Sequence, residues 1–162
     1  MESPHSADDH YRLGRSALDA GEMQQAVVHL QAAYRLDAAT PLYRSYYGLA
    51  LGLAERRLER AITLCRSAAT EEFFNPVHFH NLARVHLACG FKAEAIRYLR
   101  RGLMIDPGNA DIAAEMRRMG IRRRPALGFL RRRNPFNRLL GRVLARLQLR
   151  TEAESTPTAV SA

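Results

Sequence analysis

Apolar residues between 6 and 108 recur at helical spacing, in stretches of about twelve residues that are separated by turn-forming residues. The stretches come in pairs, and a small residue marks one position in each first stretch and one in each second stretch: Gly14, Gly48 and Ala83, then Ala26, Ala61 and Ala95. Small residues let two helix backbones approach closely. The pattern therefore predicts an all-α protein built from pairs of tightly packed helices.

Helix-start signals recur with the same period. Residues with good N-capping side chains are separated by 34, 35 and 34 positions, namely Ser6, Thr40, Asn75 and Asn109. Pro41 and Pro76 follow two of them, at the first helical position where a missing N–H is tolerated. We predict three repeats, at 6–39, 40–74 and 75–108, followed by a capping helix at 109–119.

The turns inside the repeats differ from one another. Gly21 and Gly90 separate the two helices of the first and third repeats, where the chain must reverse. The second repeat has Glu55 in this region and one additional residue between Gly48 and Ala61. We therefore expect the turn of the second repeat to differ from the other two.

The repeat resembles the tetratricopeptide repeat, a helical hairpin of 34 residues with small and large apolar residues at set positions. The third copy matches best, through Phe79, Leu82, Ala83, His86, Gly90, Ala95, Leu99, Gly102 and Pro107. The resemblance covers about two thirds of the chain, residues 6–109. It implies three hairpins stacked into a short right-handed solenoid with a concave inner face.

The same resemblance implies that the inner face carries the binding residues, which come from the first helix of each repeat. They are Tyr11, Arg12, Arg15, Ser45, Tyr46, Leu49, His80, Asn81 and Arg84. Aromatic, Arg and amide side chains in a groove suit a partner peptide or helix, although ordinary solvation of the same side chains is the simpler alternative. Asp8, Leu42 and Val77 occupy the position where relatives that clamp acidic chaperone tails carry a basic residue, so that ligand is disfavoured.

A strongly basic segment follows the repeats. Between 117 and 150 there are twelve Arg and no Lys, Asp or Glu, whereas the chain as a whole has a net charge of +9. Residues 135–149 have an amphipathic pattern with a stripe of Arg138, Arg142, Arg146 and Arg150. This helix either docks on the last repeat, lies on an anionic membrane surface, or binds nucleic acid or an acidic protein. Within 121–150, the run that comprises Phe129-Leu130, Arg133-Asn134-Pro135, Asn137 and Leu140-Gly141 also resembles the C-terminus of a group of small bacterial tetratricopeptide proteins.

Sequence signatures of catalysis are missing. We find no P-loop, no G-x-S-x-G, no H-E-x-x-H and no C-x-x-C. The cluster of His78, His80, His86 and Cys89 has the wrong spacing on a helix for one metal ion, and Cys65 is expected in the core with Cys89. We expect no enzyme activity, no cofactor, no metal and no small-molecule substrate.

The leading hypothesis is a non-catalytic scaffold or adaptor that binds a protein or peptide partner in the groove. The alternatives are a peripheral membrane or nucleic-acid-associated protein that acts through the Arg-rich helix, and a secretion-type chaperone. With no signal-peptide pattern and no long apolar run, we expect a bacterial cytoplasmic protein, or one peripheral at the inner membrane. Residues 1–5 and 151–162 are expected to be disordered.

Overall fold

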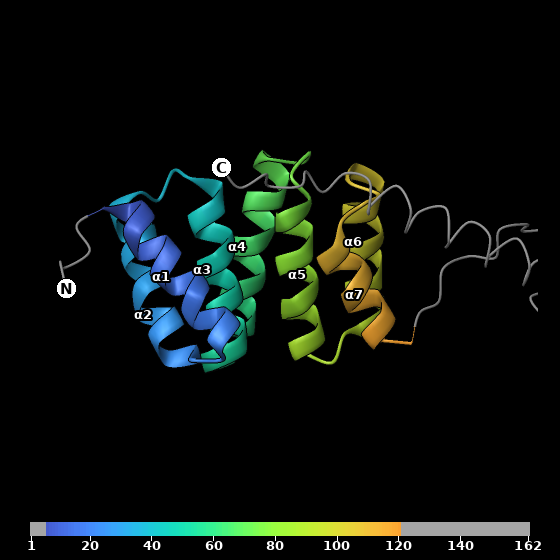
Figure 1. The fold of residues 1–162 in the computed structure, drawn as a ribbon, viewed down its shortest axis with the longest axis horizontal. Helices are drawn as coiled ribbons and strands as arrows, with labels where there is room; N and C mark the ends of the chain where they lie inside the picture. Colours follow the sequence, from blue (N-terminus) through green and yellow to red (C-terminus); the bar gives the residue numbers. More distant parts are fainter. Residues whose placement is uncertain (1–5, 121–162) are drawn as a thin grey trace, which may run out of the picture. The chain divides into compact units, whose positions relative to one another are not determined.

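The computed structural model describes residues 6–120, and these residues form seven α-helices and one π-helix without any strand (Figure 1). In chain order they are α1 (Ala7–Ala20), α2 (Met23–Leu36), α3 (Pro41–Ala50), the π-helix η1 (Leu51–Glu55), α4 (Leu58–Glu71), α5 (Pro76–Ala88), α6 (Lys92–Ile105) and α7 (Ala110–Arg118). The helix predicted at 135–149 lies outside the described residues. Within 6–120, no helix is long and apolar enough to cross a membrane.

The helices form three hairpins, which confirms the predicted architecture. Helix α1 packs on α2, α3 on α4 and α5 on α6, and adjacent hairpins meet through α2–α3 and α4–α5 contacts. Helix α7 packs on α6. Figure 1 shows the three hairpins following one another in chain order across the repeat region. The first helix of a repeat is therefore flanked by its own partner and by the preceding repeat.

Most of the predicted helix ends are present. Ser6, Asn75 and Asn109 accept hydrogen bonds from backbone N–H groups of their helices, and Gly21 and Gly90 both have a φ of 80°. Thr40 is the N-cap residue of α3, as predicted, but its hydroxyl makes no capping bond and instead donates to the Asp37 carboxylate. The Asp37 carboxylate also accepts a hydrogen bond from the backbone N–H of Thr40. Asp37 therefore holds the start of α3 from within the loop between α2 and α3.

The extra residue of the second repeat is absorbed by the π-helix. Leu51–Glu55 continues α3 with a wider turn, which takes up one additional residue without breaking the helix. Arg56 then adopts a left-handed conformation with a φ of 52°. It occupies the place that Gly21 and Gly90 fill in the other hairpins, and its guanidinium donates to the Ala88 carbonyl oxygen of the next repeat, 3.2 Å away.

The small residues mark the places where helices cross most closely. A Cβ added to Gly48 would lie 2.8 Å from Cys65 Sγ and 2.9 Å from the Ala61 carbonyl oxygen. A Cβ added to Gly14 would lie 2.5 Å from Leu30 Cγ. Real Cβ atoms do not come this close to their neighbours, so these glycines set the spacing of their hairpins.

A partly buried hydrogen-bonded pair, His78 with Glu72, lies at the junction between the second and third hairpins. The fully buried His78 ring lies with its Nε2 2.8 Å from Glu72 Oε2, and the Asn75 amide donates to the same carboxylate at 2.9 Å. These two bonds, from His78 first, lower the pKa of Glu72. The carboxylate thus ties the end of α4 to the start of α5.

We predict that Gly48→Ala destabilises the protein by about 1–3 kcal/mol, because the new methyl group meets a backbone oxygen that cannot move without shifting α4. Gly108→Ala is the matched control, since the nearest atom to its added Cβ is Asp106 Oδ1 at 3.5 Å. It should change the free energy of unfolding by less than about 0.5 kcal/mol. Denaturant unfolding followed by circular dichroism measures both, and equal effects would refute the close-crossing explanation.

We also predict that the Glu72 carboxylate contributes to the loss of folding stability at acidic pH. Its pKa is lower in the folded state than in the unfolded chain, so its stabilising contribution is present above the unfolded pKa and is lost as pH falls through the folded pKa. The difference in unfolding free energy between about pH 7 and about pH 3 should therefore be smaller in Glu72→Gln than in the wild type. Glu59→Gln, an exposed change on α4, should leave that difference unaltered.

Candidate binding groove

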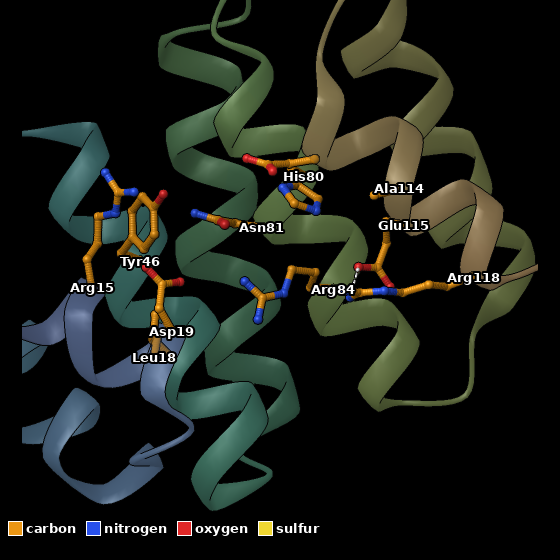
Figure 2. Close-up of a pocket in the computed structure, with 11 residues that line it drawn as sticks. Arg15, Leu18, Asp19, Tyr46, His80, Asn81, Arg84, Ala114, Glu115 and Arg118 are labelled. Atoms are coloured by element: carbon orange, nitrogen blue, oxygen red, sulfur yellow. Dashed lines mark ion pairs between the residues drawn. The ribbon is translucent and has the colours of Figure 1, made fainter.

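A groove of about 350 Å³ runs along the first helices of the repeats and ends at α7 (Figure 2). Its lining side chains all come from α1, α3, α5 and α7, and none comes from the second helices. They are Arg15, Leu18, Asp19, Tyr46, His80, Asn81, Arg84, Asp111, Ala114, Glu115 and Arg118. The groove therefore lies on the face for which binding residues were expected.

The structure brings five of the nine predicted residues together in this groove: Arg15, Tyr46, His80, Asn81 and Arg84. Arg12 does not line it. Arg12 is exposed on α1 and pairs with Asp8 one turn earlier.

Tyr11, Ser45 and Leu49 are corrections, because they were expected on an exposed surface and are buried. Their exposed fractions are 8%, 0% and 0%. The reason for Ser45 and Leu49 is the position of α3, which contacts α2, α4 and α5 and so has little free surface. Tyr11 is covered by the rings of Tyr43 and Tyr46, whose centroids lie 5.3 and 5.2 Å from its own.

The wall formed by α1 and α3 is aromatic, with one cation fixed on it. The Arg15 guanidinium carbon lies 5.8 Å from the centroid of the Tyr46 ring, a cation–π distance. Burial raises the pKa of Tyr11 to about 12, so its phenol stays neutral near pH 7. Arg15 has no carboxylate partner within 6–120, and its charge is available at the groove surface.

Helix α5 supplies the floor of the groove through Asn81 and His80. The Asn81 Nδ2 donates to the buried Ser45 hydroxyl at 3.1 Å, which leaves its Oδ1 without a hydrogen bond to any described residue. His80 Nε2 is also buried without a hydrogen-bond partner among these residues. Burial, followed by the nearby Arg84 charge, lowers the pKa of His80, so the ring is neutral near pH 7. The floor is polar, uncharged and incompletely hydrogen-bonded.

Helix α7 supplies the opposite wall, which the sequence prediction omitted. Asp111, Glu115 and Arg118 line this side, and Arg118 Nη1 lies 3.6 Å from Glu115 Oε2 (Figure 2). A signal for these residues was present in the repeat. Counting 34 positions on from His80, Asn81 and Arg84 gives a further set of equivalent residues: Ala114, Glu115 and Arg118.

The remaining candidates for chemistry are structural. His86 is buried and its ring stacks on Tyr98 with centroids 5.2 Å apart, while burial lowers its pKa. Burial raises the pKa of Cys65 to about 12 and also raises that of Cys89, so both thiols stay protonated near pH 7. Within 6–120, no three His, Cys, Asp or Glu side chains converge on one point. Arg138, Arg142, Arg146 and Arg150 lie outside the described residues.

Comparison with known proteins identifies the fold. No family model and no curated protein matches the sequence. The first tetratricopeptide domain of human RPAP3 superposes with a TM-score of 0.59 at 18% identity, covering 73% of this chain and 92% of that domain. The Arabidopsis OM64 tetratricopeptide domain gives 0.56 at 18% identity, with coverages of 70% and 93%. The first tetratricopeptide domain of Spaghetti, bound to the HSP90 peptide SRMEEVD, gives 0.56 at 16%, with coverages of 71% and 90%. The repeat region thus has the tetratricopeptide fold.

We predict that Ser45 and Asn81 are energetically coupled across the α3–α5 contact. Either single change to Ala leaves the other side chain buried without its partner, so the double variant should be less destabilised than the sum of the singles. The coupling energy expected from a double-mutant cycle of unfolding free energies is about 1 kcal/mol. A cycle of Ser67 with Asn81 is the control, because the exposed Ser67 hydroxyl donates to Leu64 and not to Asn81. Additive effects in the first cycle would contradict the prediction.

Proposed function

We propose that this protein is a non-catalytic interaction module that binds an extended segment of a partner protein in the groove formed by α1, α3, α5 and α7. The observation that carries the proposal is the incomplete hydrogen bonding of the groove floor. His80 Nε2 is buried without a hydrogen-bond partner among the described residues, and Asn81 is held beside it by the bond from its Nδ2 to the Ser45 hydroxyl. A buried polar atom without a partner is costly, and a bound chain relieves that cost.

The chemistry of the groove specifies what kind of segment fits. Asn81 Oδ1 is placed to accept a backbone N–H of the bound chain, because Ser45 fixes the amide orientation. Arg15 and Arg84 line the same groove without carboxylate partners of their own, and an Asp or Glu side chain satisfies either guanidinium. The exposed part of Tyr46 gives the segment an apolar ring to cover. The proposed ligand is an extended segment with acidic side chains.

Two structural neighbours support the ligand class. The Spaghetti domain carries the HSP90 peptide SRMEEVD, and the second tetratricopeptide domain of human RPAP3 carries the HSP70 peptide SGPTIEEVD. In the present chain Asp8, Leu42 and Val77 are not basic, so the proposal rests on Arg15 and Arg84 and on acidic side chains within a segment.

The proposed role is that of a scaffold or adaptor. Both thiols are held protonated near pH 7, and Cys65 is enclosed in the core, so neither cysteine is an activated nucleophile. Membrane or nucleic-acid association through the Arg-rich helix depends on residues outside 6–120. No observation on the described residues favours it, or a secretion-type chaperone, over the groove.

We predict that peptides selected from a displayed random library on the wild-type protein carry Asp or Glu and bind through the groove. Tyr46→Ala and Arg84→Ala should each weaken the affinity for a synthetic copy of a selected peptide by about tenfold or more, because each removes a contact at the centre of the groove. Isothermal titration calorimetry measures the affinities. Circular dichroism checks that both variants keep their helices.

Arg97→Ala is the matched control, because Arg97 is an exposed arginine on the second helix α6 and does not line the groove. It should leave the affinity within about twofold of the wild type. If the selected peptides bind the Tyr46→Ala/Arg84→Ala double variant as tightly as the wild type, the groove is not the binding site and the proposal fails.

A further inference from the structure

His80 lies on α5, the helix that forms the floor of the groove. Figure 2 shows its ring between the side of the groove that carries Arg15 and Tyr46 and the side formed by α7. The His80 side chain is half-buried, and its Nε2 is buried without a hydrogen-bond partner among the described residues. A segment that fills the groove therefore meets an imidazole whose hydrogen bonding is incomplete.

Four charged side chains influence the His80 ring from α5 and α7. Arg84 lies one turn further along α5, and α7 contributes Asp111, Glu115 and Arg118. Burial is the main cause that lowers the pKa of His80, and the Arg84 charge lowers it further, while the two α7 carboxylates raise it. In the protein alone, the ring is therefore neutral near pH 7.

The elements across the groove add one charge of each sign. Helix α1 contributes Arg15 and Asp19, and α3 contributes the phenol of Tyr46. The three arginines of the groove are thus matched by three carboxylates. A carboxylate that a ligand brings into the groove is a negative charge in excess of this balance.

An acidic side chain that pairs with Arg84 changes the charge around His80. Its carboxylate neutralises the guanidinium, which is one cause of the low pKa, and it places a negative charge beside the ring. An opposite charge within about 4–6 Å favours the protonated form of an imidazole. A protonated ring carries a hydrogen on both nitrogens, so the buried Nε2 then has a proton to donate to that carboxylate. The ligand and the proton therefore stabilise each other in the groove.

We propose that His80 makes binding in the groove dependent on pH: an acidic segment binds together with a proton that His80 takes up, and its affinity rises as the pH falls from about 7.5 to about 5.5. This coupling rests on the proposed function, since it requires an acidic side chain beside Arg84. A group whose pKa is higher in the complex than in the free protein adds affinity that is fully present below the lower value and is lost as the pH rises through the higher one. Asp and Glu side chains of the segment stay ionised in this window, because their ordinary pKa values lie near about 4.

The test is calorimetric titration of the full chain, at about pH 7.5 and about pH 5.5, with a synthetic copy of a library-selected acidic peptide that contains no His. The affinity should be about three- to tenfold higher at the lower pH, because His80 binds at most one proton. Titrations in two buffers of different ionisation enthalpy, at about pH 6.5, should show uptake of part of one proton per peptide bound. A copy of the peptide with Asn and Gln in place of every Asp and Glu should lose both effects. Circular dichroism at each pH establishes that the protein is folded.

The variants assign the proton to one ring. His80→Asn should remove the pH dependence and the proton uptake, whatever its affinity at the higher pH. His29→Asn is the control, because His29 lies on α2 outside the groove, with its Nδ1 3.2 Å from Nδ1 of His10, and this variant should keep both effects. In the wild type, the NMR titration midpoint of the His80 ring protons should move to higher pH when the peptide is bound.

Failure of the coupling and failure of the proposed function give different results. If the peptide binds the Tyr46→Ala/Arg84→Ala double variant as tightly as the wild type at the higher pH, the proposed function fails and the coupling fails with it. If binding depends on those two residues, three results overturn the coupling alone. They are a wild-type affinity that is equal or lower at the lower pH, a pH dependence that survives in His80→Asn, and a His80 titration midpoint that the peptide leaves unchanged.

Discussion

The close crossing of paired helices is the constraint on which the rest of the structure depends. At Gly14 and Gly48 a single methyl group would meet Leu30, Cys65 or a backbone oxygen at under 3 Å. Because interiors are packed as densely as organic crystals, the hairpin spacing has little freedom to relax. That spacing fixes how far apart the first helices lie, and hence where the side chains of the groove face each other. The same crossing in the first hairpin brings the rings of His10 and His29 together.

One position of the repeat has a different environment in the second repeat than in the first and third. The position of Arg15 and Arg84 is taken by Leu49 in the second repeat, and Leu49 is fully buried. The central helix α3 instead contributes Tyr46 to the surface and Ser45 to the interior. Ser45 accepts from Asn81 and so orients the amide that faces the groove. The core of the middle repeat therefore determines the orientation of the Asn81 amide, which links folding stability to the proposed binding.

The sequence was sufficient to predict the hairpins, the turn glycines and five residues of the groove, because those features repeat with a fixed period. It was insufficient where tertiary contacts override the period. Leu49 occupies the repeat position of a surface arginine, yet it is fully buried, because α3 packs against α2, α4 and α5. The sequence showed that the second repeat has one extra residue, but it did not indicate that a π-helix at Leu51–Glu55 accommodates it. His10 and His29 are 19 residues apart, and only the aligned hairpin brings them into contact.

Charge is distributed unevenly between the repeat region and the segment that follows it. Residues 6–120 hold fifteen Arg and Lys against thirteen Asp and Glu, whereas 121–150 hold ten Arg and no acid. Within the groove, three arginines are balanced by three carboxylates, so the proposed acidic segment would be attracted mainly at short range, by individual side chains. In the proposed binding mode, selection depends on where Arg15, Arg84 and the Asn81 amide lie relative to one another. Arginine-specific geometry of this kind is lost in an Arg→Lys change even though the charge is kept, because only the planar guanidinium forms paired hydrogen bonds with a carboxylate.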